Sequence, residues 1–164
     1  GFKRVGQYFL LHFPGLGVVI KQIELSRLGY LLGNLLHAGL PVVKALHLLA
    51  TAATLYKYQR LYVDLAESLE EGNSFQKTFA QNKSARQLIP APVQQMIVAG
   101  EQSGQLSESL LNIGEIFEEK TELATKNLSV ILEPVLLVIV WLGVVGVAIA
   151  VILPLYKLIG GLSS

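Results

Sequence analysis

The residues of this chain with the clearest chemical spacing are glutamates. Four of them stand at i, i+3, i+4 and i+7, so a helix would carry on one face Glu115, Glu118, Glu119 and Glu122. Like charges at these spacings repel each other by about 0.2–0.5 kcal/mol per pair. Three interpretations are open: a solvated face, a docking face for a basic partner, or a metal site, although no Glu-x-x-His pair supports a di-iron centre.

No arrangement typical of an enzyme accompanies these carboxylates. Asp64 is the one aspartate of the sequence, which excludes the paired aspartates of an intramembrane peptidase. His12, His37 and His47 stand in no catalytic string, and the glycine-rich residues 100–104 lack the lysine of a phosphate-binding loop. We therefore expect no catalytic residue, no cofactor and no metal.

A run of 23 uncharged residues separates Glu133 from Lys157. At about 1.5 Å per residue, a helix of this length covers the roughly 30 Å hydrocarbon core of a bilayer. We predict a transmembrane helix over residues 133–158 and a short tail over residues 159–164. Small residues allow neighbouring helices to approach closely inside a membrane, and the candidate packing positions are Gly143, Gly146 and Ala150.

Charge places the body of the chain relative to the span. The 13 basic and 12 acidic residues give a net charge of +1, which offers no broad surface for nucleic acid. Lys120 and Lys126 closely precede the span and Lys157 alone follows it, so the positive-inside rule predicts a body that faces the cytoplasm. Because the chain begins with Gly1 and not with Met, we expect a piece of a longer protein.

Apolar residues recur with helical spacing outside the span, and no segment alternates as a strand would. Glycine and proline breaks, with Ser74 as an N-cap, give predicted helices over 23–38, 41–53, 58–71, 75–80, 93–102 and from 107 into the span. The polar residues 81–89 are predicted to form a loop. The expected fold is all-α: an approach segment over 1–20 and a six-helix bundle over 21–132, which continues into one C-terminal transmembrane helix.

Several short motifs follow one another along residues 13–158. The most specific is Gly100-Glu-Gln-Ser-Gly-Gln-Leu106, and an earlier one is Leu36-His-Ala-Gly-Leu-Pro-Val-Val-Lys-Ala-Leu46. The others are Phe13-Pro-Gly-Leu-Gly17, Glu71-Gly72 followed by Ser74-Phe75, and Glu133-Pro134 followed by Leu153-Pro-Leu-Tyr156. In this order they resemble the motifs of the type II secretion system protein F family, whose type IV pilus members are inner-membrane platform proteins.

The resemblance implies a scaffold in the bacterial inner membrane. Family members usually carry two cytoplasmic helical repeats and three spans, and this chain is similar to the second repeat with the final span. The implied partners are a motor ATPase, pilin or pseudopilin subunits, other inner-membrane assembly proteins, membrane lipid and further copies of the chain. The resemblance also implies which residues form the turns of the family motifs, namely Gly39, Pro41, Gly100, Glu101 and Gly104. His37 and Lys44 depart from the family pattern.

The functional hypothesis is therefore a platform that couples the motor ATPase to pilin or pseudopilin assembly. The last helix would act as the lever, and its four-glutamate face would meet a partner. The alternative from another class is a membrane-anchored helical binding module or receptor subunit unrelated to secretion. A fragment of a transporter permease would need further spans and ionisable side chains within the span, and this span carries none.

Overall fold

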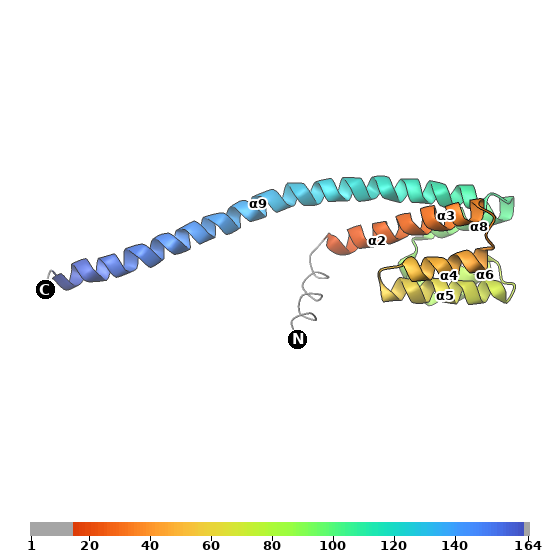
Figure 1. Ribbon diagram of the computed structural model, residues 1–164, viewed down its shortest axis with the longest axis horizontal. Coiled ribbons are helices and arrows are strands. Elements are labelled where there is room, and N and C mark those ends of the chain that lie inside the picture. Colours follow the sequence, from red (N-terminus) through yellow and green to blue (C-terminus); the bar gives the residue numbers. More distant parts are fainter. Residues whose placement is uncertain (1–14, 163–164) are drawn as a thin grey trace. The chain divides into compact units, whose positions relative to one another are not determined.

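The computed structural model describes residues 15–162, and over this range the chain is helical with no strand (Figure 1). The predicted all-α fold with a long apolar C-terminal helix is confirmed. Phe13, the first part of the predicted approach segment and the last two residues of the predicted tail lie outside the described residues. The elements are α2 Leu16–Arg27, the π-helical turn η1 Leu28–Leu32, α3 Gly33–His37, α4 Val42–Ala52, α5 Tyr56–Glu70, α6 Phe75–Gln81, α7 Lys83–Leu88, α8 Ala91–Ser103 and α9 Leu106–Leu162.

Two compact units divide the chain after Ala124. In the first, helices α2 to α8 pack with residues 106–124 of α9 and form the bundle. The second consists of the rest of α9, from Thr125 onward.

Two local predictions are wrong. Residues 81–89 contain a helix, α7, which begins because the side chain of Asn82 accepts a hydrogen bond from the Ala85 amide at 2.9 Å. The first helix begins at Leu16 and not at residue 23, and it is divided by the π-helical turn η1. The bundle therefore holds more helical segments than the six predicted. The Ser74 N-cap is as expected, since its hydroxyl accepts from the Lys77 amide at 3.2 Å.

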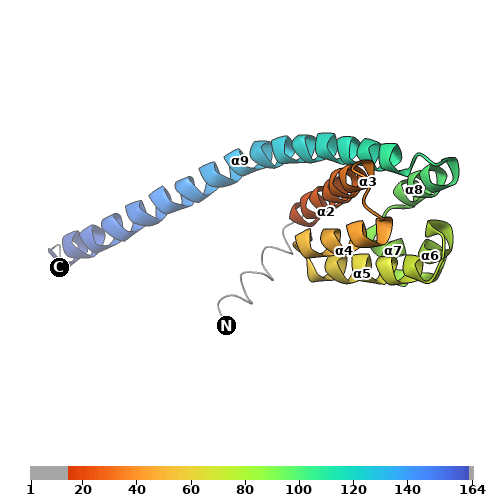
Figure 2. The same cartoon turned by 45° about the vertical axis from the view of Figure 1, so that its right-hand side comes forward.

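The bundle core is built on the antiparallel pair α4 and α5, which lie side by side in both views (Figures 1 and 2). Their large buried side chains are at most 1% exposed, and burying each one stabilises the fold by about 1.5–3 kcal/mol. The phenylalanines of α6 extend the core, with ring centroids 5.6 Å apart. Further core side chains come from α2 and η1, from α8 and from the bundle part of α9, namely Leu25, Leu28, Leu32, Val93, Ile97, Leu110, Ile113 and Phe117.

Helix η1 meets the bundle part of α9 with almost no space between the two backbones. A Cβ atom on Gly29 would collide with the Gly114 amide nitrogen and lie 2.6 Å from the Gly114 Cα. A Cβ atom on Gly114 would lie 2.8 Å from the Tyr30 backbone nitrogen, and one on Gly33 would lie 2.9 Å from the Leu111 side chain. Glycine is therefore required at this crossing, because backbone atoms cannot move aside as a flexible side chain can.

Hydroxyl groups on both sides strengthen this crossing. Ser26 Oγ donates to the Gly114 carbonyl at 3.3 Å, and Ser107 Oγ donates to the Gly33 carbonyl at 2.9 Å. Each bond joins one helix to a backbone oxygen of the other, so the two helices are fixed in register as well as in distance.

A buried carboxylate holds α2 to the turn between α4 and α5. Glu24 is 1% exposed, and its Oε1 accepts from the Thr54 amide at 2.9 Å and from Arg27 Nη1 at 3.1 Å. The same Arg27 nitrogen donates to the Ala52 carbonyl at 3.1 Å and to Thr54 Oγ1 at 3.0 Å. A buried carboxylate without a partner would strongly destabilise the fold, so these contacts hold α2 against the turn between α4 and α5.

Two tyrosines of α5 lie near this carboxylate. Burial, followed by the charge of Glu24, raises the pKa of Tyr58 to about 12, and its hydroxyl donates to the Leu88 carbonyl at 3.2 Å. The same two causes raise the pKa of Tyr62 well above its ordinary value. Both phenols are therefore protonated at neutral pH and serve the core as polar but uncharged groups.

The second unit is a single apolar helix whose large side chains are exposed, among them Trp141 at 71% and Tyr156 at 76%. By length and composition, α9 is the one helix of the described residues that could cross a membrane. A Cβ atom added at Gly143 or Gly146 would meet nothing within 4 Å, so these two positions are open to a neighbouring helix. The helix continues through Pro134 and Pro154.

Replacing Gly29 by alanine tests the helix crossing. We expect Gly29→Ala to destabilise the bundle by about 1–3 kcal/mol, because the added methyl overlaps backbone atoms of α9. Thermal unfolding of the detergent-solubilised chain, followed by circular dichroism, measures the change. Gly17→Ala in the first turn of α2 is the control: its Cβ meets nothing within 4 Å, so this variant should be at least as stable as the wild type. Equal unfolding midpoints for the two variants would contradict the crossing.

Candidate functional site

The four glutamates of the stripe are exposed on the bundle part of α9, but they do not have equal surroundings. Glu118 accepts a hydrogen bond from the Tyr30 hydroxyl at 2.7 Å. Glu122 and Glu118 line a surface pocket of about 340 Å³ together with Arg27 and Tyr30. Glu115 and Glu119 form no ion pair with the described residues. The stripe therefore divides into one carboxylate held by η1, one at the pocket wall and two open to a partner.

The Tyr30–Glu118 bond changes the chemistry of the phenol. The hydrogen bond to Glu118, then desolvation, then the charges of Glu118 and Glu115 raise the pKa of Tyr30 to about 12. The negative charges of Glu118 and Glu115 on α9 thus act on a phenol of η1. Among the described residues, no group of three His, Asp or Glu side chains is placed to hold a metal ion.

The motif over residues 100–106 forms the joint between α8 and α9. Gly104 has a φ of +72°, and the Gln105 amide donates to the Gly100 carbonyl at 2.8 Å, which ends α8 in a left-handed turn. A Cβ atom on Gly100 would lie 2.5 Å from Ser109 Oγ and 3.1 Å from the Leu106 Cα. Glycine at position 100 therefore lets the first turn of α9 fold back onto α8.

Glu101 in the same motif caps a different helix. Its two carboxylate oxygens accept from the Phe75 amide, at 3.0 and 3.2 Å, at the first turn of α6. A carboxylate there satisfies a free amide and favours the positive end of the helix dipole. The predicted family residue thus has a structural role, since it ties α6 to α8.

The motif around Gly39 and Pro41 forms the turn between α3 and α4. Gly39 has a φ of +90°, and the Leu40 amide donates to the Leu35 carbonyl at 3.0 Å. Pro41 precedes α4 as its N-cap residue, with a φ of −59°. The predicted turn residues therefore act through backbone conformation.

The contact between Gly29 and Gly114 was not predicted from the sequence. Its signal is the spacing Gly29-x-x-x-Gly33, which places two small residues on one helix face. Its partner, Gly114, stands alone in the sequence, and only the packing of the helices pairs it with Gly29.

An all-α bundle followed by a long apolar helix defines a helical protein with a candidate transmembrane segment. Comparison with known proteins gives the family: type II secretion system (T2SS), protein F, matches residues 30–154. The chain therefore belongs to this family, and the resemblance seen in the motifs is confirmed.

Individual relatives agree with the family. TapC, a type IV pilus assembly protein of Aeromonas hydrophila, is 29% identical over 152 residues, covering 92% of this chain and 35% of TapC. PilC, the type IV pilus assembly protein of Thermus thermophilus, is 29% identical over 163 residues, covering 98% and 39%. Protein F of the type II secretion system of Xanthomonas campestris is 30% identical over 157 residues, covering 96% and 38%. The chain thus spans less than half the length of these curated relatives.

Removing the Glu101 carboxylate tests the joint. We expect Glu101→Ala to destabilise the bundle by about 1–2 kcal/mol, because the Phe75 amide loses its charged acceptor. Glu101→Gln keeps one acceptor oxygen and should lose less. Thermal unfolding by circular dichroism measures both, with Gln95→Ala, at an exposed position of the same helix, as the control. If Glu101→Ala unfolds at the wild-type midpoint, the cap does not stabilise α6.

The Tyr30–Glu118 bond predicts a pH effect. Because the pKa of Tyr30 is raised from 10.0 to about 12, its contribution to stability is complete below pH 10 and is lost as the pH rises through about 12. The tyrosinate absorbance, taken as the difference between the wild type and Tyr30→Phe, gives the titration. Glu118→Gln should move its midpoint down toward 10, whereas Glu108→Gln should leave it in place. An unmoved midpoint in Glu118→Gln would rule out the bond.

Proposed function

We propose that this chain is part of an inner-membrane platform protein that couples a cytoplasmic motor ATPase to the assembly of pilins or pseudopilins. The observation that carries the proposal is the family match over residues 30–154, which includes most of the bundle and most of the apolar helix. The relatives' names supply the two settings, type IV pilus assembly and type II secretion. Within such a machine the chain acts as a scaffold and catalyses no reaction.

The proposed position has the bundle in the cytoplasm and residues 133–158 across the bacterial inner membrane. The exposed apolar side chains from Thr125 onward support a lipid or protein environment. Lys120 and Lys126 on the bundle side, against Lys157 alone on the other, support the orientation. The open face at Gly143 and Gly146, with Ala150 one turn further on, supports packing against other spans of the assembly, including those of further copies.

The proposed docking face is the part of the acidic stripe that the bundle leaves open. Glu115 and Glu119 are exposed and unpaired among the described residues, whereas Glu118 is bonded to Tyr30. Repulsion between carboxylates one turn apart is relieved when a basic surface binds. Contact with such a surface would weaken as salt rises, since exposed charges are screened over about 8 Å at physiological ionic strength.

The rigid joints of the bundle support a role in transmitting force. The glycine crossing joins η1 to the bundle part of α9, Gly100 joins α8 to the same helix, and the Glu101 cap joins α6 to α8. A partner that pushes on one helix would therefore displace the bundle as a unit. The alternative, a membrane-anchored binding module or receptor subunit unrelated to secretion, predicts no contact with a motor ATPase or with pilins.

Crosslinking in native membranes tests the proposal. We expect an affinity-tagged chain to recover a motor ATPase together with pilins or pseudopilins. Recovery of neither would contradict the platform and favour the alternative.

Charge reversal tests the docking face separately. Glu115→Lys with Glu119→Lys should impair pilus or pseudopilus assembly while the circular dichroism spectrum stays unchanged. The matched control is Glu67→Lys with Glu70→Lys, which reverses two exposed carboxylates on α5. Normal assembly by the α9 variant would remove the acidic face from the mechanism.

A further inference from the structure

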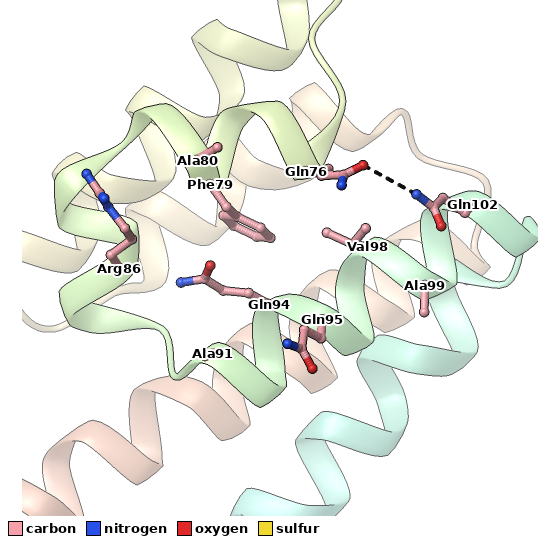
Figure 3. A pocket seen from close by; sticks show the side chains of 10 residues that line it. All are labelled: Gln76, Phe79, Ala80, Arg86, Ala91, Gln94, Gln95, Val98, Ala99 and Gln102. Carbon is pink, nitrogen blue, oxygen red and sulfur yellow. Dashed lines mark hydrogen bonds between the residues drawn. The ribbon is translucent and has the colours of Figure 1, made fainter.

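Helices α6, α7 and α8 enclose a surface groove of about 410 Å³ (Figure 3). Val98 and Ala99 contribute apolar surface to its lining, whereas the Phe79 ring, which Figure 3 shows turned toward α8, is only 3% exposed. At one end, the amide groups of Gln76 and Gln102 meet across the groove at 3.4 Å. The groove thus offers an apolar surface bordered by uncharged polar groups.

Arg86 is the one charged side chain among the described residues that line the groove. It is exposed, and the described part of the chain supplies no carboxylate to pair with it. Figure 3 shows its side chain at the end of the groove away from Gln102. An occupant that matches this surface would bring apolar side chains and a carboxylate.

The outer face of the bundle part of α9 has that combination. Ile116, Glu119 and Leu123 stand at i, i+3 and i+7, so they form one ridge on the helix. Ile116 is 40% exposed and Leu123 is 57% exposed, although both belong to the bundle unit and not to the apolar second unit. The Glu119 carboxylate between them is also unpaired among the described residues.

The two surfaces also agree in length. The lining on α8 runs from Ala91 to Gln102, which is about 16 Å along a helix axis. Ile116 and Leu123 are about 10 Å apart along α9. The ridge therefore fits within the groove, with room for an arginine side chain to reach a carboxylate between two apolar anchors.

We infer that the groove of one copy of this chain receives the Ile116–Glu119–Leu123 ridge of a second copy, with Arg86 paired to Glu119. The inference deepens the proposed docking face, on which it rests, by naming its basic partner. Groove and ridge are different surfaces of the same bundle, so the contact is head-to-tail. Such a contact leaves one groove and one ridge free in each pair, and it closes into a ring or extends into a chain.

Cysteine crosslinking tests this contact in the full chain, which has no cysteine of its own. Two variants combine Ala99→Cys in the groove with Ile116→Cys or Leu123→Cys on the ridge. We expect oxidation in native membranes to give a ladder of dimers and larger species in at least one of them. Ala99→Cys with Glu70→Cys, which places the second thiol on α5, is the matched control and should give no ladder.

A charge swap identifies the pair. In the crosslinking variant, Arg86→Glu should lower the yield about tenfold, the scale of one interfacial charge pair, and adding Glu119→Arg should restore it. Both substituted side chains are exposed, and circular dichroism verifies that the bundle is folded. Absence of a ladder in both cysteine pairs, crosslinks to another protein alone, or failure of the swap to restore the yield would overturn the inference. If native-membrane crosslinking recovers the motor ATPase but neither cysteine pair gives a ladder, the contact between copies is wrong and the proposed function stands.

Discussion

The bundle depends on the distance between two glycines. Gly29 and Gly114 bring the backbones of η1 and α9 closer than any side chain would permit, and a single methyl group on either one would overlap main-chain atoms of the other helix. The two serine bonds and the Tyr30–Glu118 bond all span this crossing, so each requires the same close approach. The π-helical turn over Leu28–Leu32 falls at the same place, which is consistent with a helix adjusted locally to a demanding contact.

The joint over residues 100–104 extends this constraint to the rest of the bundle. Gly100 lets α9 begin against α8, and Glu101 fixes the start of α6 to α8. Since α6 and α8 are two walls of the groove in Figure 3, the same carboxylate that caps a helix also joins these two walls. In this member of the type II secretion system protein F family, the motif residues Gly100 and Glu101 thus hold helices of the bundle together.

Local signals in the sequence were sufficient for most of the helices. Apolar spacing, together with glycine and proline breaks, located α4, α5 and α8, because the helical period of the sequence and the burial of one face agree there. Helix α7 was missed because its segment is polar, and its stability comes from the Asn82 cap and the buried Ala85. Spacing alone placed four glutamates on one face, but only tertiary structure bonds Glu118 to Tyr30 and leaves Glu119 open. The crossing and the groove join residues far apart in the chain, which no local pattern reveals.

Native-state hydrogen exchange of the intact chain tests the central claim, that the glycine crossing holds η1 and the bundle part of α9 together as one cooperative unit. The predicted result is slow exchange of the amides of Leu28–Leu32 and of residues 110–117, with the same free energy of opening for both segments. Fast exchange in Leu28–Leu32 while residues 110–117 remain protected would contradict the claim, because the two helices would then open independently.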